Sequence, residues 1–182
     1  MNKYLKWGLI IIVSLAALLY GAYLFMINQT KKHSPEEIVT YNLDGYDLEV
    51  FYNRPYKKGR NIFGGLVPYG QVWRTGANEA TTFQTATDLS IDGKPLKAGK
   101  YTLWTIPEAT SWTVIFNSKQ YAWGVNRSGA SREAEEDALQ VVVPVGNIPN
   151  EVEQFTITLE AEGGQPQLVF TWDRTRVAVP LK

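Results

Sequence analysis

The chain has 182 residues, no net formal charge and no cysteine, which excludes disulfides, cysteine–metal sites and thiol catalysis. Lysine and arginine are spread thinly, and without a basic patch that displaces counterions nucleic acid is not an expected partner. The only histidine, His33, lies outside the predicted domain, so a Ser–His–Asp triad or a multi-histidine metal site within the domain is excluded. We expect no metal and no cofactor.

The N-terminal part of the chain is predicted to be a membrane helix. No charged residue occurs from Trp7 to Ile27, and at the helical rise this run spans about 30 Å, the thickness of a hydrocarbon core. A buried core helix is disfavoured because the run has no polar face. We predict a tail at residues 1–6, a transmembrane helix at 7–27 in the lipid bilayer, a polar linker at 28–40 and a folded domain at 41–182.

A cleaved signal peptide is the main alternative for this apolar run. The apolar region of a signal peptide is usually about 7–15 residues long and precedes a small-x-small cleavage site. This run is longer, and Tyr20 and Tyr23 interrupt the small residues around Gly21 and Ala22. These features favour an uncleaved signal anchor.

The orientation of the anchor is predicted from the charges that flank it. Lys3 and Lys6 precede the apolar run and Lys31 and Lys32 follow it, so the positive-inside count is close to a tie. Because a short N-terminal tail is easily left inside while a larger domain is exported, we expect the domain to be extracytoplasmic, in a periplasm or cell envelope.

The domain is predicted to be all-β. Residues 46–52 alternate between apolar and polar, Asp92-Gly93 favours a tight hairpin turn, and Tyr101–Ile106 and Trp112–Asn117 form a predicted hairpin. Further strands are expected at 81–89, 139–145, 155–160, 168–172 and 176–179, and one or two helical turns between 131 and 139. Short strands with turn signals every 8–12 residues or so indicate an antiparallel β-sandwich, jelly-roll or immunoglobulin-like.

The candidate functional residues gather around one stretch, residues 54–82, which reads RPYKKGRNIFGGLVPYGQVWRTGANEATT. The candidate ligand-binding residues are Arg54, Arg60, Trp73, Arg74, Asn78 and Glu79, together with Trp104 and Trp123 further along the chain. In one interpretation they form a polar pocket, in which arginine and asparagine donate, glutamate accepts and tryptophan stacks on a sugar or similar ring. In the other they form a structural corner, with an arginine paired to Glu79.

The tryptophans and carboxylates of the domain constrain both interpretations. Trp112 lies on an apolar strand face and is expected in the core, whereas Trp104 and Trp123 are expected nearer the surface.

Glycoside hydrolysis needs two carboxylates about 5–9.5 Å apart. Glu79 could be one of them, but the other acids lie at turns or strand ends, so no catalytic residue is assigned.

Four segments of the domain resemble a known family. They are GRNIFGGLVPYGQVWRTGANEATTF, AGKYTLWTIP, WTVIFN and the pair Trp123-Gly124. They resemble the bacterial domain-of-unknown-function family 2911, from about Tyr46 to the C-terminus. The resemblance implies an exported or envelope-associated β-sandwich and brings no established reaction or catalytic residue. Members of that family often begin with a cleavable signal, from which the longer apolar run departs.

The sequence therefore predicts a single-pass membrane protein with an extracytoplasmic β-sandwich. Its expected role is that of a non-catalytic binding or envelope-associated module with a glycan or peptide ligand. A carbohydrate-directed hydrolase that uses Glu79 and a purely structural envelope component are the alternatives.

Overall fold

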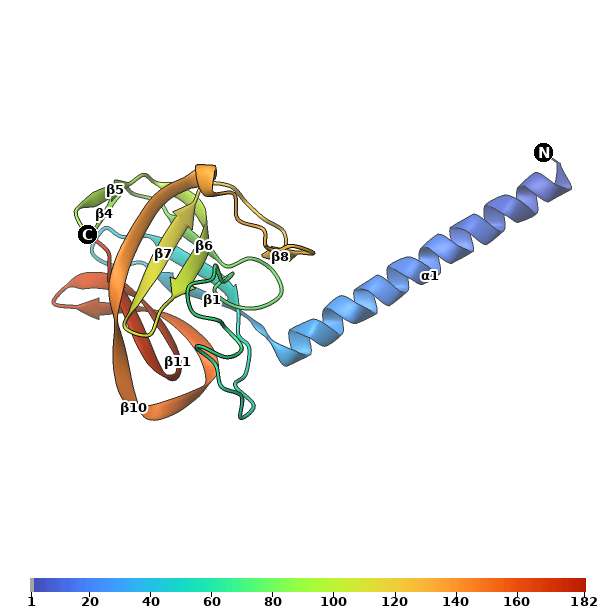
Figure 1. Cartoon of the computed structure of the whole chain (residues 1–182). Coiled ribbons are helices and arrows are strands. Elements are labelled where there is room, and N and C mark those ends of the chain that lie inside the picture. The colour runs from blue at the N-terminus through green and yellow to red at the C-terminus, as the bar shows by residue number, and fades with distance from the viewer. Residues whose placement is uncertain (1) are drawn as a thin grey trace. The chain divides into compact units, whose positions relative to one another are not determined.

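The computed structural model describes residues 2–182, which divide at His33 into two compact units (Figure 1). The first unit is the helix α1 (Lys3–His33), and none of its residues is buried. It is long and apolar enough to cross a membrane, although a signal sequence would pass the same test. The helix extends past the predicted bounds of 7–27 at both ends, and its last turn carries Lys31, Lys32 and His33, where positive charge complements the helix dipole.

The second unit is built almost entirely of antiparallel strands, as predicted. Its main strands are β1 (Glu36–Tyr41), β2 (Leu48–Asn53), β3 (Thr82–Thr85), β6 (Gly99–Pro107), β7 (Ser111–Asn117), β10 (Asp137–Glu162) and β11 (Gln165–Pro180). They form one seven-stranded sheet in the order β1-β2-β3-β6-β7-β10-β11. Two small hairpins are added, β4 (Leu89–Ile91) with β5 (Lys94–Leu96) and β8 (Val125–Asn126) with β9 (Gly129–Ala130), and the 3-10 turn η1 (Ala134–Glu136) precedes β10.

The predicted turns are confirmed, whereas several strand bounds differ from those expected. β6 pairs with β7, and Asp92 and Gly93 make the β4–β5 turn with φ angles of 52° and 72°. β1 begins at Glu36, inside the segment expected to be a linker, because residues 36–41 pair with β2 along their whole length. The four strands expected after residue 139 are parts of two long strands, β10 and β11.

The two long strands bend, and this converts one sheet into a sandwich. The pairing of β10 with β11 shifts register between Asn147 and Val152. In addition, the N–H of Leu181 donates to Pro166 O at 2.8 Å, although an extended strand of 16 residues would hold its ends about 50 Å apart. The chain must therefore turn back within β11, and Asp173, with φ 56°, lies midway between the two bonded residues.

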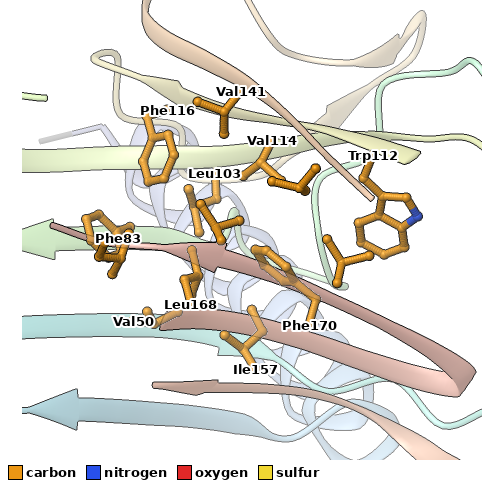
Figure 2. Close-up of a cluster of buried hydrophobic side chains, with 14 of the residues drawn as sticks. Val50, Phe83, Leu103, Trp112, Val114, Phe116, Val141, Ile157, Leu168 and Phe170 are labelled. Atoms are coloured by element: carbon orange, nitrogen blue, oxygen red, sulfur yellow. The ribbon is translucent and has the colours of Figure 1, made fainter. Parts of the chain in front are cut away.

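The hydrophobic core lies between the two layers (Figure 2). Side chains of β2, β3, β6 and β7 on one side, such as Phe83 and Phe116, face Ile157, Leu168 and Phe170 of β10 and β11 on the other. An aromatic cluster fills one part of this core, and its members are Phe63, Trp73, Trp112, Phe155, Phe170 and Trp172. Trp112 is 2% exposed, so its predicted place in the core is confirmed.

The glycine-rich segment before β3 runs beside β6. Gly70 N donates to Pro107 O (2.9 Å), Trp73 and Thr105 exchange backbone hydrogen bonds of 2.7 and 3.0 Å, and Leu103 N donates to Thr81 O (2.8 Å). These contacts continue the sheet on the N-terminal side of β3. They position the candidate functional residues against the middle of β6.

Candidate functional site

Arg74 and Trp104 are neighbours on the face of the sheet that points away from the core. The antiparallel pair formed by Trp73 and Thr105 sets Arg74 opposite Trp104 in the register. Side chains alternate along a strand, and Trp73 belongs to the core-facing aromatic cluster, whereas Trp104 lies outside that core. Arg74 and Trp104 therefore share the outer face.

A loop that follows β7 covers this pair. Residues 118–133 connect β7 to η1 and carry the β8–β9 hairpin. The ring of Tyr121 contacts the ring of Trp104 edge-on, with 5.3 Å between centroids. Thr102 Oγ1 donates to Lys119 O at 2.7 Å, and Glu133 N donates to Tyr121 Oη at 2.9 Å. We call residues 118–133 the covering loop.

The covering loop lies close to Arg74 at Gly124. A Cβ at this position would lie 2.5 Å from Arg74 Cβ and 2.8 Å from Arg74 Cδ. Real side chains do not approach so closely, so glycine is needed here to let the backbone of the loop lie on the aliphatic part of the arginine. The sequence pair Trp123-Gly124 is thereby placed next to Arg74.

The guanidinium of Arg74 is a partly desolvated cation. Its N–H donates to Asn78 O at 3.3 Å. Burial lowers the pKa of Arg74, and the nearby negative charge of Glu79 only partly opposes this effect. Arginine stays protonated at any physiological pH, so the site holds a partly buried positive charge near Glu79.

Trp104 is fully buried, and its indole nitrogen has no hydrogen-bond partner. Among residues 2–182, Trp104 Nε1 is the one buried side-chain polar atom that lacks a partner. The expectation that Trp104 lies near the surface is wrong, because the covering loop shields it completely, whereas Trp123 in that loop is 37% exposed, as expected. A buried donor without an acceptor costs about 1–3 kcal/mol.

Behind Arg74, Asn53, Asn78 and Glu79 form a connected polar group. Asn53 Nδ2 donates to Glu79 Oε2 at 3.1 Å, and Asn78 Nδ2 lies within reach of both Asn53 Oδ1 (3.4 Å) and Ser34 O (3.3 Å). Asn78 has φ 53°, a left-handed conformation that asparagine tolerates better than most residues. This group holds the turn after Arg74 against the end of β2, and the printed partner of Glu79 in it is Asn53, whereas the sequence suggested an arginine.

Asn53 is a site residue that sequence reasoning missed. It is fully buried and directly follows Leu48, Val50 and Tyr52, the alternating core residues of β2. One signal could have identified it. The asparagine falls out of phase with the apolar alternation, at the end of a strand and directly before Arg54-Pro55.

Three of the predicted site residues lie elsewhere and make structural contacts. Arg54 pairs with Glu37 and donates to Phe155 O (3.2 Å) and Thr156 Oγ1 (2.9 Å). Arg60 donates to backbone carbonyls of its own loop, at Lys57 and Tyr56. Trp73 is partly buried against the core and stacks on Trp172, with 6.0 Å between ring centroids. The structure thus brings together Arg74, Asn78, Glu79, Trp104 and the loop that carries Trp123.

Asp88 and Asp92, two other acidic residues of the domain, have places of their own in the fold. Within residues 2–182 no group of three or more metal-ligating side chains could hold an ion. Asp88 is paired with Lys97, and Asp92 lies in the β4–β5 turn. A groove of about 670 Å³ lies between β10, β11 and that turn, and it shares no residue with the predicted site.

The fold and these contacts define an antiparallel β-sandwich domain that follows one long apolar helix. The chain belongs to the family described as proteins of unknown function, DUF2911, whose model matches residues 34–181. The match covers the whole β-rich unit and leaves α1 outside. No curated protein and no solved structure matches the chain.

Proposed function

We propose that the protein is a single-pass membrane protein that holds a non-catalytic binding module outside the cytoplasm, in a periplasm or cell envelope. The observation that carries the anchor is α1, a helix of 31 residues with no buried side chain. At 1.5 Å per residue such a helix exceeds the roughly 30 Å of a hydrocarbon core. A helix this apolar is stable when lipid surrounds it.

The absence of cysteine makes the topology directly measurable. In the variant Gln84→Cys the thiol lies on the exposed side of β3, and in Asn2→Cys it precedes the helix. A membrane-impermeant maleimide should label Gln84→Cys in intact cells and Asn2→Cys only after lysis. The opposite pattern would place the domain in the cytoplasm. Release of the protein by alkaline carbonate, with an intact mass that lacks the N-terminal residues, would show a cleaved signal instead of an anchor.

The binding site that we propose is the Arg74–Trp104 pair beneath the covering loop. It offers two donors on one face, the partly desolvated guanidinium and an indole N–H without a partner. Once the covering loop moves aside, both would gain from a ligand that supplies acceptor oxygens, as glycans and peptides do. Trp123, exposed on the covering loop, would meet such a ligand at the edge of the site.

The binding proposal is tested with glycan and peptide arrays on the full chain in nanodiscs. Trp104→Phe removes the indole N–H and keeps a buried ring, and Arg74→Lys keeps the charge without the planar donors. We expect both variants to lose a ligand that the parent binds, while Arg60→Lys, which changes an arginine outside the site, keeps it. Arrays on which the parent captures nothing, or equal capture by all four proteins, would contradict the binding role.

A purely structural envelope component is the second candidate. The observation that favours it is the hydrogen-bonded group of Asn53, Asn78 and Glu79, which fixes the corner without any ligand. If this role is the correct one, substitutions at Arg74 and Trp104 will change the melting temperature and leave the array results of parent and variants alike.

A further inference from the structure

The corner formed by Arg74 and Asn78 holds the residue at which the chain leaves α1. The helix ends at His33, and the next residue, Ser34, is buried and accepts a hydrogen bond from Asn78 Nδ2 at 3.3 Å. Asn78 O in turn accepts a hydrogen bond from the Arg74 guanidinium at 3.3 Å. The chain therefore passes from the helix into this corner within one residue.

The covering loop is in contact with the same corner. The backbone of Gly124 lies against the aliphatic part of Arg74, where a Cβ would come within 2.5 Å of Arg74 Cβ. Only the side chains of Arg74 and Asn78 therefore separate Gly124 from Ser34. Within the domain, β8 of this loop lies on the opposite side of the sandwich from the β4–β5 hairpin (Figure 1).

The exposed side chains of the covering loop suit a lipid interface. Trp123 and Val125 flank Gly124 and are 37% and 38% exposed. Arg127 is exposed in the turn between β8 and β9, and residues 122–131 include no acidic side chain. Tryptophan is enriched where hydrocarbon meets headgroups, because its ring is apolar and its N–H is polar. Arginine binds phosphate oxygens through its planar donors.

The length of α1 brings the bilayer within reach of this loop. The uncharged part of the helix ends at Ile27, and the six residues from there to His33 add no more than about 9 Å of helix. The headgroup layer on one side of a bilayer is roughly 5–8 Å thick, outside a hydrocarbon core of about 30 Å. If α1 spans the membrane, Ser34 lies at the outer edge of the headgroups, together with the corner that binds it.

We propose that the covering loop docks on the bilayer that α1 spans, with Trp123 and Val125 in the interface and Arg127 among the lipid phosphates. This inference rests on the anchor proposed above. A protein partner fits less well, because a tryptophan and a valine that are each little more than one-third exposed offer far less than the roughly 800 Å² that each partner buries in a stable complex. A bilayer needs only a shallow contact, since the anchor already holds the loop close to it.

The test uses full-length protein in nanodiscs whose lipids carry a nitroxide quencher near the headgroup. Because the chain has no cysteine, one introduced thiol carries the fluorophore NBD. The thiol is placed by Ser128→Cys in the β8–β9 turn, or by Pro95→Cys at an exposed position of β5, on the opposite side of the sandwich (Figure 1). Trp123→Asp, combined with Ser128→Cys, puts a charge into the proposed contact. Trp123→Tyr is the matched control, since tyrosine is also enriched at the interface.

We expect quenching at Ser128 to be at least about threefold stronger than at Pro95, because an interfacial ring holds the loop at the quencher. Trp123→Asp should lower the quenching at Ser128 to the level at Pro95, and Trp123→Tyr should keep most of it. Equal quenching at the two positions, or no effect of Trp123→Asp, would overturn the docking and leave the anchor intact. Protein that does not co-elute with the nanodiscs would contradict the anchor and the docking together.

Discussion

At the scale of single residues, Asn53 decides how tightly the corner is held. Its amide donates to Glu79 Oε2 at 3.1 Å, and the residue is fully buried. Glu79→Ala leaves this amide without that acceptor, at a cost of about 1–3 kcal/mol of unfolding free energy. Glu79→Gln keeps a side-chain oxygen and should cost less than half as much. Urea unfolding followed by circular dichroism measures both values, and equal losses in the two variants would contradict the role given to the hydrogen bond.

Gly124 tests the contact between the covering loop and Arg74. Its φ lies outside the left-handed region, so Gly124→Ala introduces no backbone strain and acts only through the clash of the new Cβ with Arg74. Overpacking of this kind costs about 1–3 kcal/mol, and the loop should shift outwards and uncover Trp104.

Acrylamide quenching of tryptophan fluorescence measures this shift. We expect stronger quenching in Gly124→Ala than in the parent, and no change in the control Ala122→Ser, which alters an exposed residue of the same loop. Unchanged quenching in Gly124→Ala would show that the loop does not shield the indole.

The site residues show what local pattern can and cannot predict. Arg74, Asn78 and Glu79 lie near one another, as their closeness in the sequence suggested, because one turn of the chain carries all three. It could not predict the burial of Trp104, since the residues that cover it, such as Tyr121, lie 17 positions further along the chain, in a loop without a periodic pattern. Arg54 does not group with them because it binds the carbonyl of Phe155, which only the folded chain brings near. Arg60 does not because it donates to carbonyls of its own loop.

At the scale of elements, Asp137 joins the covering loop to the start of β10. Its carboxylate pairs with Arg132 and accepts hydrogen bonds from Asn117 (2.8 Å) and Gln140 (2.7 Å). Burial alone would raise the pKa of Asp137, but the hydrogen bonds and charge of Arg132 and the bonds from Asn117 and Gln140 outweigh it, so the pKa lies below its ordinary value of 3.8.

This shift gives a prediction for the dependence of stability on pH. A carboxyl group whose pKa is lowered by folding stabilises the folded state above its unfolded pKa, and that contribution is lost as the pH falls through the folded pKa. We therefore expect Asp137→Asn to be less stable than the parent at pH 7 and the difference to shrink below about pH 4. Urea midpoints at pH 7, 5 and 3 measure this, and a difference that stays constant down to pH 3 would contradict it.

The strands show where prediction of elements succeeded. Hairpins with local turn signals, such as Asp92-Gly93 and the β6–β7 pair, were predictable because the turn and both strands lie in one short window. The continuity of β10 was not predictable, because residues such as Pro144, Gly146 and Pro149 normally interrupt strands. In the structure, bends and register shifts accommodate them within one strand. Pro144 and Pro180 have no N–H to donate, and each of the next two hydrogen-bonded pairs beyond Val145↔Val177 contains one of them.

At the scale of the whole molecule, the chain consists of a helix without a buried face and a sandwich with its own core. Every residue of the core cluster comes from Tyr41 or later in the sequence, and α1 contributes no buried residue. The long apolar helix was predictable from composition alone, since a long uncharged run has few other stable conformations. Its bounds were less predictable, because a helix can continue into polar residues such as those at 28–33 once the apolar part has formed.

The last prediction follows from this division. A variant that lacks residues 2–33 should stay in solution without detergent and melt within about 3 °C of the full chain, because it keeps the whole core and also Ser34, whose carbonyl accepts a hydrogen bond from Asn78. A variant that lacks residues 2–41 also loses β1, which pairs with β2 over six residues, and buried Tyr41. Loss of these contacts should cost several kcal/mol, which corresponds to a melting temperature at least 10 °C lower. Scanning calorimetry measures both transitions. If removal of residues 2–33 alone unfolds the domain, the helix is part of the fold and its role as a separate anchor is wrong.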